Sequence, residues 1–197
     1  VTHLGIFGIS MLSNIPNLVY MAPICKEEYL AMLEWSIDQQ EHPVVISMPG
    51  NGVHGAKYPV DTNYDDINTY QVCRQGDTVA VLALGDFFQL GEEAAEEIEK
   101  TLGKKVTLIN PRYASGLDEK TLDELKKNHS VIVTLEDGIL DGGFGQKVAS
   151  YYGGDDIRVL NFGIKKDFYD RYDPAELMKE NHLTKELITK DVCAYCS

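Results

Sequence analysis

The stretch TVAVLALGDFFQLGEEAAEEIEKTLGKKVTLINP, residues 78–111, decides the fold that we expect. It opens with an apolar run over 78–85, continues with a segment over 89–103 that reads as a helix, and closes with a second apolar run over 105–111. Short apolar runs of this kind are typical of buried strands. The stretch therefore predicts a strand, a helix and a second strand, in which the two strands run parallel.

The same alternation continues toward the C-terminal end of the chain. We expect strands over 130–137 and 157–163, and helices over 118–128, 143–153, 174–183 and 184–195. Strands rich in Val, Ile and Leu that alternate with helices indicate a largely parallel sheet covered on both faces. We therefore predict a three-layer α/β domain over 69–197.

Residues 1–50 carry a second α/β pattern that is too short to stand alone. A strand over 17–23, a helix over 25–40 and a strand over 42–50 are predicted, and two strands with one helix cannot close a core. The segment that follows is rich in Gly, Pro, Asn and Asp and has no sustained periodicity, so we assign a linker to 51–68. Residues 1–50 are thus expected to be the end of another α/β domain.

Composition excludes several classes of function. The 197 residues carry 31 acidic and 18 basic side chains, a formal charge of -13, which would repel a nucleic-acid backbone. The longest apolar stretches are far short of a membrane span. Four cysteines and the absence of an apolar leader favour reduced thiols in the cytoplasm. We expect neither nucleic acid nor membrane as a partner.

His3 is the strongest single candidate for a catalytic side chain. It lies between Thr2 and Gly5, a residue type that lets backbone approach a ligand, and an imidazole exchanges protons near neutral pH. The remaining histidines stand beside Pro, Gly or Asn at the edges of elements and are expected at the surface: His42, His54, His129 and His182.

Three further motifs imitate functional sites. GDFFQLG, residues 85–91, with Asn110 downstream imitates the Gly-Asp-Gly turn and Asn of a thiamine-diphosphate site, but Phe87 replaces the second Gly, which favours an ordinary turn. EDGILDGGFG, residues 136–145, could seat an anion at a helix N-terminus, but its acidic side chains favour a structural turn. Cys193 and Cys196 have zinc or redox spacing without a partner pair, so we expect a frayed tail.

Several segments, taken together, resemble one enzyme family. They are THLGIFGISMLSNIPNLVYMAP, GDTVAVLALGDFFQLGEEAAEEIE, VTLINPRYASGLDEKTLDEL, VIVTLEDGILDGGFGQKV and ENHLTKELITKDV. In this order they resemble the C-terminal portion of the 1-deoxy-D-xylulose-5-phosphate synthases, thiamine-diphosphate enzymes of the transketolase family. The resemblance covers nearly the whole chain. It implies that residues 1–50 end a pyrimidine-binding domain and that 69–197 form the transketolase C-terminal domain.

The resemblance also implies what this chain would lack and what it would keep. In the family, the residues that hold thiamine diphosphate and Mg²⁺ and the activating Glu lie upstream of the segments present here. The chain alone is therefore expected to be inactive and to bind no cofactor, and the sequence leaves open whether Val1 is a natural start. His3 matches the family's Thr-His-x-Gly histidine, which is thought to assist proton transfers in the substrate channel.

Departures from the family pattern concern the acceptor substrate. Gly8 stands where the family has Asp, and ISMPG places Ser47 and Gly50 where Arg residues are expected. In the family, the enzyme condenses pyruvate with glyceraldehyde 3-phosphate for isoprenoid precursors, and an Arg grips the phosphate. Without that bidentate partner, we expect weaker use of a phosphorylated acceptor.

Other interpretations stay open at this stage. The chain could be the small subunit of a split transketolase that pairs with a cofactor-binding polypeptide, or a dimerisation module without chemistry. The family resemblance implies a homodimer; co-purification with a cofactor-binding partner would favour the split subunit, and a lone stable homodimer would favour the dimerisation module. A nucleotide-binding Rossmann domain is disfavoured, because no predicted strand is followed by G-x-G-x-x-G. The sequence leaves open whether Arg112 and Glu136 form a buried pair.

Overall fold

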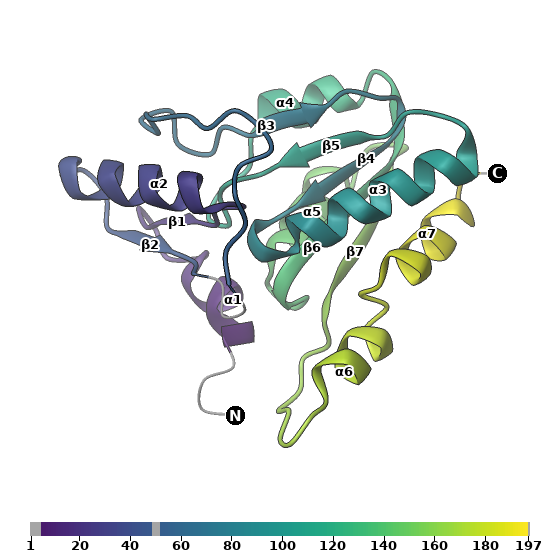
Figure 1. The fold of residues 1–197 in the computed structure, drawn as a ribbon. Helices are drawn as coiled ribbons and strands as arrows, with labels where there is room; N and C mark the ends of the chain where they lie inside the picture. The colour runs from purple at the N-terminus through teal and green to yellow at the C-terminus, as the bar shows by residue number, and fades with distance from the viewer. Residues whose placement is uncertain (1–4, 49–51, 197) are drawn as a thin grey trace.

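A computed structural model describes residues 5–48 and 52–196 of the chain (Figure 1). Five helices and strands belong to the N-terminal part: η1 (Gly5–Phe7), α1 (Gly8–Leu12), β1 (Val19–Met21), α2 (Lys26–Asp38) and β2 (Val44–Ile46). The rest of the chain forms β3 (Gln71–Arg74), β4 (Thr78–Ala83), η2 (Gly85–Phe87), α3 (Phe88–Leu102), β5 (Thr107–Asn110), α4 (Glu119–Leu125), β6 (His129–Ile139), α5 (Phe144–Tyr151), β7 (Arg158–Ile164), α6 (Pro174–Glu180) and α7 (Lys185–Cys193). Nearly every predicted element is present.

The five-stranded sheet has the order β3-β5-β4-β6-β7. Strands β5, β4, β6 and β7 are parallel, and β3 pairs antiparallel with β5 at one edge. The predicted, largely parallel sheet is therefore confirmed, with β3 as an addition that the apolar pattern does not reveal. This strand has four residues, of which Val72 is exposed, so it carries no buried run.

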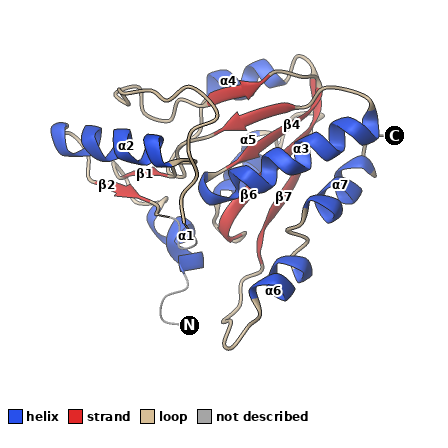
Figure 2. Ribbon diagram, viewed as in Figure 1, coloured by secondary structure: helices blue, strands red, loops and turns tan. Residues whose placement is uncertain are grey.

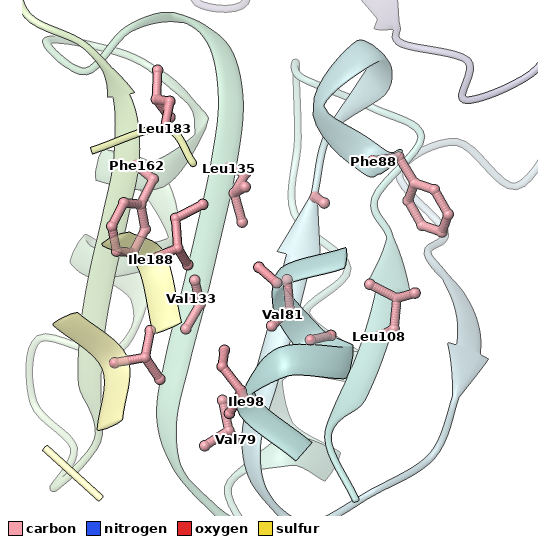
Figure 3. Close-up of a cluster of buried hydrophobic side chains, with 14 of the residues drawn as sticks. Val79, Val81, Phe88, Ile98, Leu108, Val133, Leu135, Phe162, Leu183 and Ile188 are labelled. Atoms are coloured by element: carbon pink, nitrogen blue, oxygen red, sulfur yellow. The ribbon is translucent and has the colours of Figure 1, made fainter. Parts of the chain in front are cut away.

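Helices cover both faces of this sheet (Figure 2). Alternate residues of the central strands enter two different cores, as the period of two in a strand requires. Val79, Val81 and Leu108 pack with Ile98 of α3 and Ile188 of α7, and Figure 3 shows these side chains between the strands and the two helices. On the opposite face, the same strands pack against α4 and α5 through a cluster that includes Leu82, Ile132, Leu122, Phe144 and Val148. The predicted three-layer architecture is confirmed.

Two glycines set the position of α3. Gly103 follows the helix with φ 67°, and its N–H donates to the carbonyl of Glu99 at 2.8 Å, which is the left-handed geometry that ends many helices. Gly91 lies where α3 approaches β4 most closely, because a Cβ there would come within 2.3 Å of Ala83 Cβ. The predicted helix 89–103 is therefore present as α3, closest to β4 near its first turns and ended by Gly103.

The N-terminal part forms a small parallel sheet of its own. β1 and β2 pair in register from Val19 opposite Val44 to Met21 opposite Ile46. α2 begins after Cys25, whose Sγ accepts the N–H of Glu28 at 3.4 Å, and it buries Met32 and Trp35. Figure 1 shows this unit beside the carboxyl ends of β4 and β5, and Met21 forms a bridge with Tyr113.

The segment between the two sheets has neither helix nor strand over 52–70 in the described part. It is nevertheless fixed at several points. Tyr64 is buried and packs edge-on against Trp35 of α2, and Lys57 forms a 2.7 Å ion pair with Glu92 of α3. The division at 51–68 stays a prediction, since these contacts tie the segment to both neighbours.

No helix in the described ranges has the length and apolar character needed to cross a membrane.

Candidate functional site

The candidate site lies at the carboxyl ends of β1 and β2, where the chain leaves the two-stranded sheet. His3 and Gly50, which the sequence analysis singled out, fall outside the described residues. Ser47 directly follows β2, and its N–H donates to the carbonyl of Met21 at 2.8 Å. The parallel pairing thereby fixes Ser47 at the sheet edge.

Tyr20 of β1 contributes a phenol group beside Ser47. The residue is only 7% exposed, and burial raises the pKa of its hydroxyl. The Ser47 side chain lowers the pKa of this hydroxyl, and the charge of Asp137 raises it. The phenol therefore keeps its proton at neutral pH and can donate a hydrogen bond.

Gly8 provides the room that this phenol occupies. A Cβ at position 8 would lie 3.2 Å from the hydroxyl oxygen of Tyr20. The Asp that the family resemblance leads us to expect at this position would force the phenol or α1 to shift. Gly8 and Tyr20 are thus a matched pair, which the sequence pattern alone does not reveal.

Two carboxyl groups complete the site from the larger sheet. Asp86 lies in η2 directly after β4, and Asp137 lies toward the carboxyl end of the neighbouring strand β6. Asp86 is exposed, but partial desolvation by its neighbours and then the charge of Asp137 raise its pKa to about 6, while His54 acts to lower it. Asp137 is also exposed, and desolvation by its neighbours raises its pKa.

This group of side chains suits proton exchange with a small polar molecule. A carboxyl group with a pKa of about 6, such as that of Asp86, can give or take a proton, and the charge of Asp137 acts on both Asp86 and the hydroxyl group of Tyr20. Tyr20 and Asp86 were missed as site residues in the sequence analysis. The available signal was their position at the carboxyl ends of parallel strands, where ligands bind in many α/β folds. Within the described ranges, no cluster of three or more His, Cys, Asp or Glu side chains could hold a metal ion.

The turn that imitates a thiamine-diphosphate motif has a structural role. Gly85 adopts the left-handed φ of 56°, and a Cβ at this position would lie 3.1 Å from Ala22 Cβ. Phe87 packs against the core cluster under α3. Asn110 is buried, and its side-chain amide donates to Glu28 at 2.9 and 3.2 Å. These side chains are engaged inside the fold and do not fit a diphosphate or its Mg²⁺.

The Gly-rich segment 136–145 encloses a carboxyl group that the chain itself supplies. Glu136 is fully buried, and its carboxylate accepts the N–H groups of Phe144 and Gly145, both at 2.8 Å, at the N-terminus of α5. A Cβ at Gly143 would come within 2.3 Å of this carboxylate. Burial raises the pKa of Glu136 to about 7, although the two N–H groups and then Lys147 act to lower it. The segment is therefore a structural turn with an internal cap.

Arg112 has other partners than Glu136, which answers the question that the sequence left open. It is 5% exposed, with its Nε 3.3 Å from Glu28 Oε1 and its Nη2 2.7 Å from Asp61 Oδ2. Burial raises the pKa of Glu28, whereas the Ile24 N–H and Arg112 lower it. This pair joins α2 to the loop that follows β5.

Two expectations for cysteine and histidine are wrong. Cys193 ends α7, and both Cys193 and Cys196 pack partly buried against the core between α3 and α7, so the tail is not frayed there. Burial raises the pKa of both thiols. His129 is buried, with Nε2 2.8 Å from Thr107 Oγ1 and Nδ1 3.1 Å from the carbonyl of Leu125. Tertiary packing covers the two cysteines and His129, and the local sequence around them does not indicate that packing.

Comparison with known proteins gives a consistent picture. Residues 69–188 match the sequence family described as transketolase, C-terminal domain. Over 187 residues the chain is 33% identical to a 1-deoxy-D-xylulose-5-phosphate synthase of Geobacillus sp. (strain WCH70), covering 93% of this chain and 29% of that protein. The synthase of Clostridium tetani is 31% identical over 196 residues, covering 97% of this chain and 31% of that protein.

Solved structures share the fold at lower identity. A split gene transketolase, described as an inactive β4 tetramer, superposes with a TM-score of 0.79 at 22% identity, covering 96% of this chain and 61% of the other. A transketolase mutant from Pichia stipitis superposes with a TM-score of 0.71 at 14% identity, covering 98% of this chain and 27% of the other. The chain thus spans roughly a third of the curated synthases that it matches.

Proposed function

The chain belongs to the transketolase C-terminal domain family, and from that membership we propose that it forms the C-terminal part of a thiamine-diphosphate-dependent enzyme similar to 1-deoxy-D-xylulose-5-phosphate synthase. The observation that carries the proposal is the 33% identity, which extends over 93% of the chain and so includes the segments before residue 69. The proposed reaction joins pyruvate to an aldehyde and serves isoprenoid precursor synthesis.

The proposed assignment of domains follows the same resemblance. Residues 1–50 would end a pyrimidine-binding domain, 51–68 would connect, and 69–197 would be the C-terminal domain. The turn 85–91 and Asn110 do not fit thiamine diphosphate or Mg²⁺, because Phe87 packs against the core and the Asn110 amide is bonded to Glu28. We therefore assign the cofactor to residues outside this chain, and we expect the chain alone to be inactive. When bound, thiamine diphosphate supplies the carbanion equivalent of such reactions.

Within the proposed enzyme, the residues of this chain would orient the acceptor and move protons. His3 is the proposed proton-transfer residue. Tyr20 and Ser47 would donate hydrogen bonds at the same sheet edge, and Asp86 would exchange a proton near neutral pH. With Ser47 in place of an Arg, the proposed acceptor is held without a guanidinium group at that position, so we expect weaker use of glyceraldehyde 3-phosphate than an Arg there would give.

A second candidate is the small subunit of a split transketolase. The structural similarity to a split gene transketolase at a TM-score of 0.79 supports this alternative. That protein is described as an inactive tetramer of its β chains, which agrees with our expectation that this chain needs a cofactor-binding partner. A homodimeric dimerisation module and a cytoplasmic location stay predictions.

The deciding experiment is a cofactor titration with two samples. Calorimetry on the chain alone should show no strong, Mg²⁺-dependent binding of thiamine diphosphate, whereas the native protein purified from its own cells should bind it. An intact mass near three times that of this chain would support the synthase, and a mass equal to it with a co-purifying partner would support the split enzyme. Strong cofactor binding by the chain alone would refute both.

In that native protein, His3→Ala should lower turnover and leave cofactor affinity unchanged. The matched control is His182→Ala, which changes an exposed histidine paired with Asp191 in the C-terminal region. Unchanged turnover in the His3 variant would remove this residue from the mechanism.

A further inference from the structure

Two thiol groups lie close together in the chain at the end of α7, and the proposed function gives them no role. Cys193 is the last residue of this helix, and Cys196 follows the turn at Ala194 and Tyr195. Both are free thiols, and both are partly buried against the hydrophobic core between α3 and α7. We call them the Cys193–Cys196 pair. Each residue keeps part of its surface exposed, so a small reagent can reach the pair.

The backbone holds the two residues at a separation that a disulfide can span. The N–H of Cys196 donates to the carbonyl of Cys193 at 3.2 Å, and the N–H of Tyr195 donates to the carbonyl of Val192 at 3.0 Å. Hydrogen bonds between residues three apart draw the Cα atoms at the ends of a turn to less than about 7 Å and bring their side chains into line. Disulfides span Cα separations of about 4.4–6.8 Å. A bond between the two sulfurs therefore requires side-chain rotation and little movement of the backbone.

Contacts of the turn with its surroundings keep it in place. Tyr195, which lies between the two cysteines, packs against β7, where Arg158 Cζ is 4.3 Å from the centre of its ring. Cys196 Sγ donates to the carbonyl of Val192 at 3.4 Å, and Val192 is itself fully buried. The pair is thus held near one conformation before any bond forms, which reduces the conformational entropy lost when the disulfide closes.

The surroundings of the sulfurs favour a disulfide over a stable thiolate. Burial raises the pKa of Cys193; burial and then the charge of Cys193 raise the pKa of Cys196, while Lys104 acts to lower it. The pair also stands at the C-terminal end of α7, where the helix dipole does not stabilise a negative charge. Cysteine pairs whose reduced form is stabilised are strong oxidants, because they give up their disulfide readily. A pair without that stabilisation keeps its disulfide more firmly.

A metal ion suits this pair less well than a disulfide. Structural zinc sites take four protein ligands. Among the residues that the structure describes, no group of three or more His, Cys, Asp or Glu side chains could hold a metal ion, so the two thiols would be the main ligands. The chemistry left to the pair is the formation of a bond between its own sulfurs.

We propose that the Cys193–Cys196 pair is a modification site, which a small-molecule disulfide oxidises to an intramolecular disulfide. The thiolate of one cysteine attacks a sulfur of the small disulfide, forms a mixed disulfide and releases one small thiolate. The second cysteine then attacks the mixed disulfide, and the other small thiolate leaves. The two protons of the cysteines end on the two small thiols, so the chain loses two hydrogen atoms and the small disulfide gains them. The proposal does not depend on the proposed enzymatic function.

The test exposes the folded 197-residue chain to mixtures of reduced and oxidised glutathione. The mixtures are quenched with acid, the remaining thiols are alkylated with N-ethylmaleimide, and the chain is digested with trypsin. Cleavage after Lys190 releases residues 191–197, which contain both cysteines of the pair and no other cysteine. We expect this peptide to become lighter by two hydrogen atoms and to carry no alkyl label. Cys25 and Cys73, which have no neighbouring cysteine in the sequence, should not form this product.

Three variants show whether the fold assists closure. Cys196→Ser should give a labelled or glutathionylated Cys193 and never the lighter peptide. Arg158→Ala removes the cation beside Tyr195 and should raise the oxidised glutathione needed for half-closure by about twofold to fivefold. Lys120→Ala is the matched control, because it removes an exposed cation from α4 on the other face of the sheet. It should close as the unaltered chain does.

The proposal is overturned if peptide 191–197 carries two alkyl labels or two glutathione groups at every ratio tested, because the pair then does not close on itself. A disulfide that joins two chains through these cysteines, seen as a dimer on a non-reducing gel, would equally overturn it. So would closure at one and the same ratio by the folded chain, by Arg158→Ala and by the chain unfolded in urea, since the fold would then contribute nothing.

Discussion

Replacing Glu136 by Gln tests how the buried cap of α5 is held. The carboxyl group is fully buried and accepts two N–H groups at 2.8 Å, and its pKa is raised to about 7 mainly by burial. In the unfolded chain the same group titrates near its ordinary value of 4.5. The folded state therefore binds this proton more tightly, and its stabilising contribution is complete below pH 4.5 and lost as the pH rises through 7.

The size of the change in unfolding free energy follows from the gap between the unfolded pKa of 4.5 and the folded pKa of about 7. One pKa unit corresponds to about 1.36 kcal/mol, so between roughly pH 5.5 and 8 the unaltered chain should lose about 2 kcal/mol of unfolding free energy through this group. Glu136→Gln cannot titrate and should lack this loss. At pH 8 the variant also places an amide N–H₂ against a backbone N–H, which costs one of the two hydrogen bonds.

The assay is urea unfolding at both pH values, followed by far-ultraviolet circular dichroism. Glu180→Gln, in an exposed position at the end of α6, controls for the general effect of removing a negative charge. If the free-energy difference between the unaltered chain and Glu136→Gln is the same at pH 5.5 and 8, the assigned titration of Glu136 is incorrect.

Three further changes test other contacts. Gly91→Ala should destabilise the fold by about 1–3 kcal/mol in urea unfolding, because the added Cβ would meet Ala83 Cβ at 2.3 Å; an unchanged midpoint would contradict the close approach of α3 and β4. Arg112→Met should cost about 3–5 kcal/mol in the same assay, because it leaves the buried carboxylate of Glu28 without its cation, and adding Glu28→Gln should recover part of the loss if the pair is the cause. In the native enzyme, Ser47→Arg should raise kcat/KM for phosphorylated aldehydes about tenfold or more relative to their unphosphorylated forms; equal ratios would mean that the phosphate is bound elsewhere.

Much of the fold could be predicted because its signals are local. The apolar runs that became β4, β5, β6 and β7 are continuous in sequence, and parallel strands buried on both faces require such runs. The helix that became α3 ends at a glycine in the left-handed conformation, a signal carried by one residue. The strand β3 escaped prediction, since an edge strand of four residues needs no buried run.

The candidate site could be predicted only in part. Ser47 stands out through a departure from a family pattern, whereas Tyr20 and Asp86 look like ordinary strand and turn residues. The significance of Gly8 is visible only beside Tyr20, because a Cβ at position 8 would make a tight contact of 3.2 Å with the hydroxyl oxygen of that residue.

The sequence by itself determined the order of strands and helices, the parallel sheet and the family, since each depends on short segments read in order. Only the tertiary structure decided that Glu136 caps α5 and that Arg112 pairs with Glu28 instead. Arg112 and Glu28 come from distant parts of the chain, as do Asn110 and Glu28, which lie 82 residues apart, so only folding brings them together. Glu136 is eight residues from Phe144, but it caps α5 only because the end of β6 packs against the start of that helix. A buried charge takes whichever partner the packing of helices and strands brings within reach, and that choice is made in three dimensions.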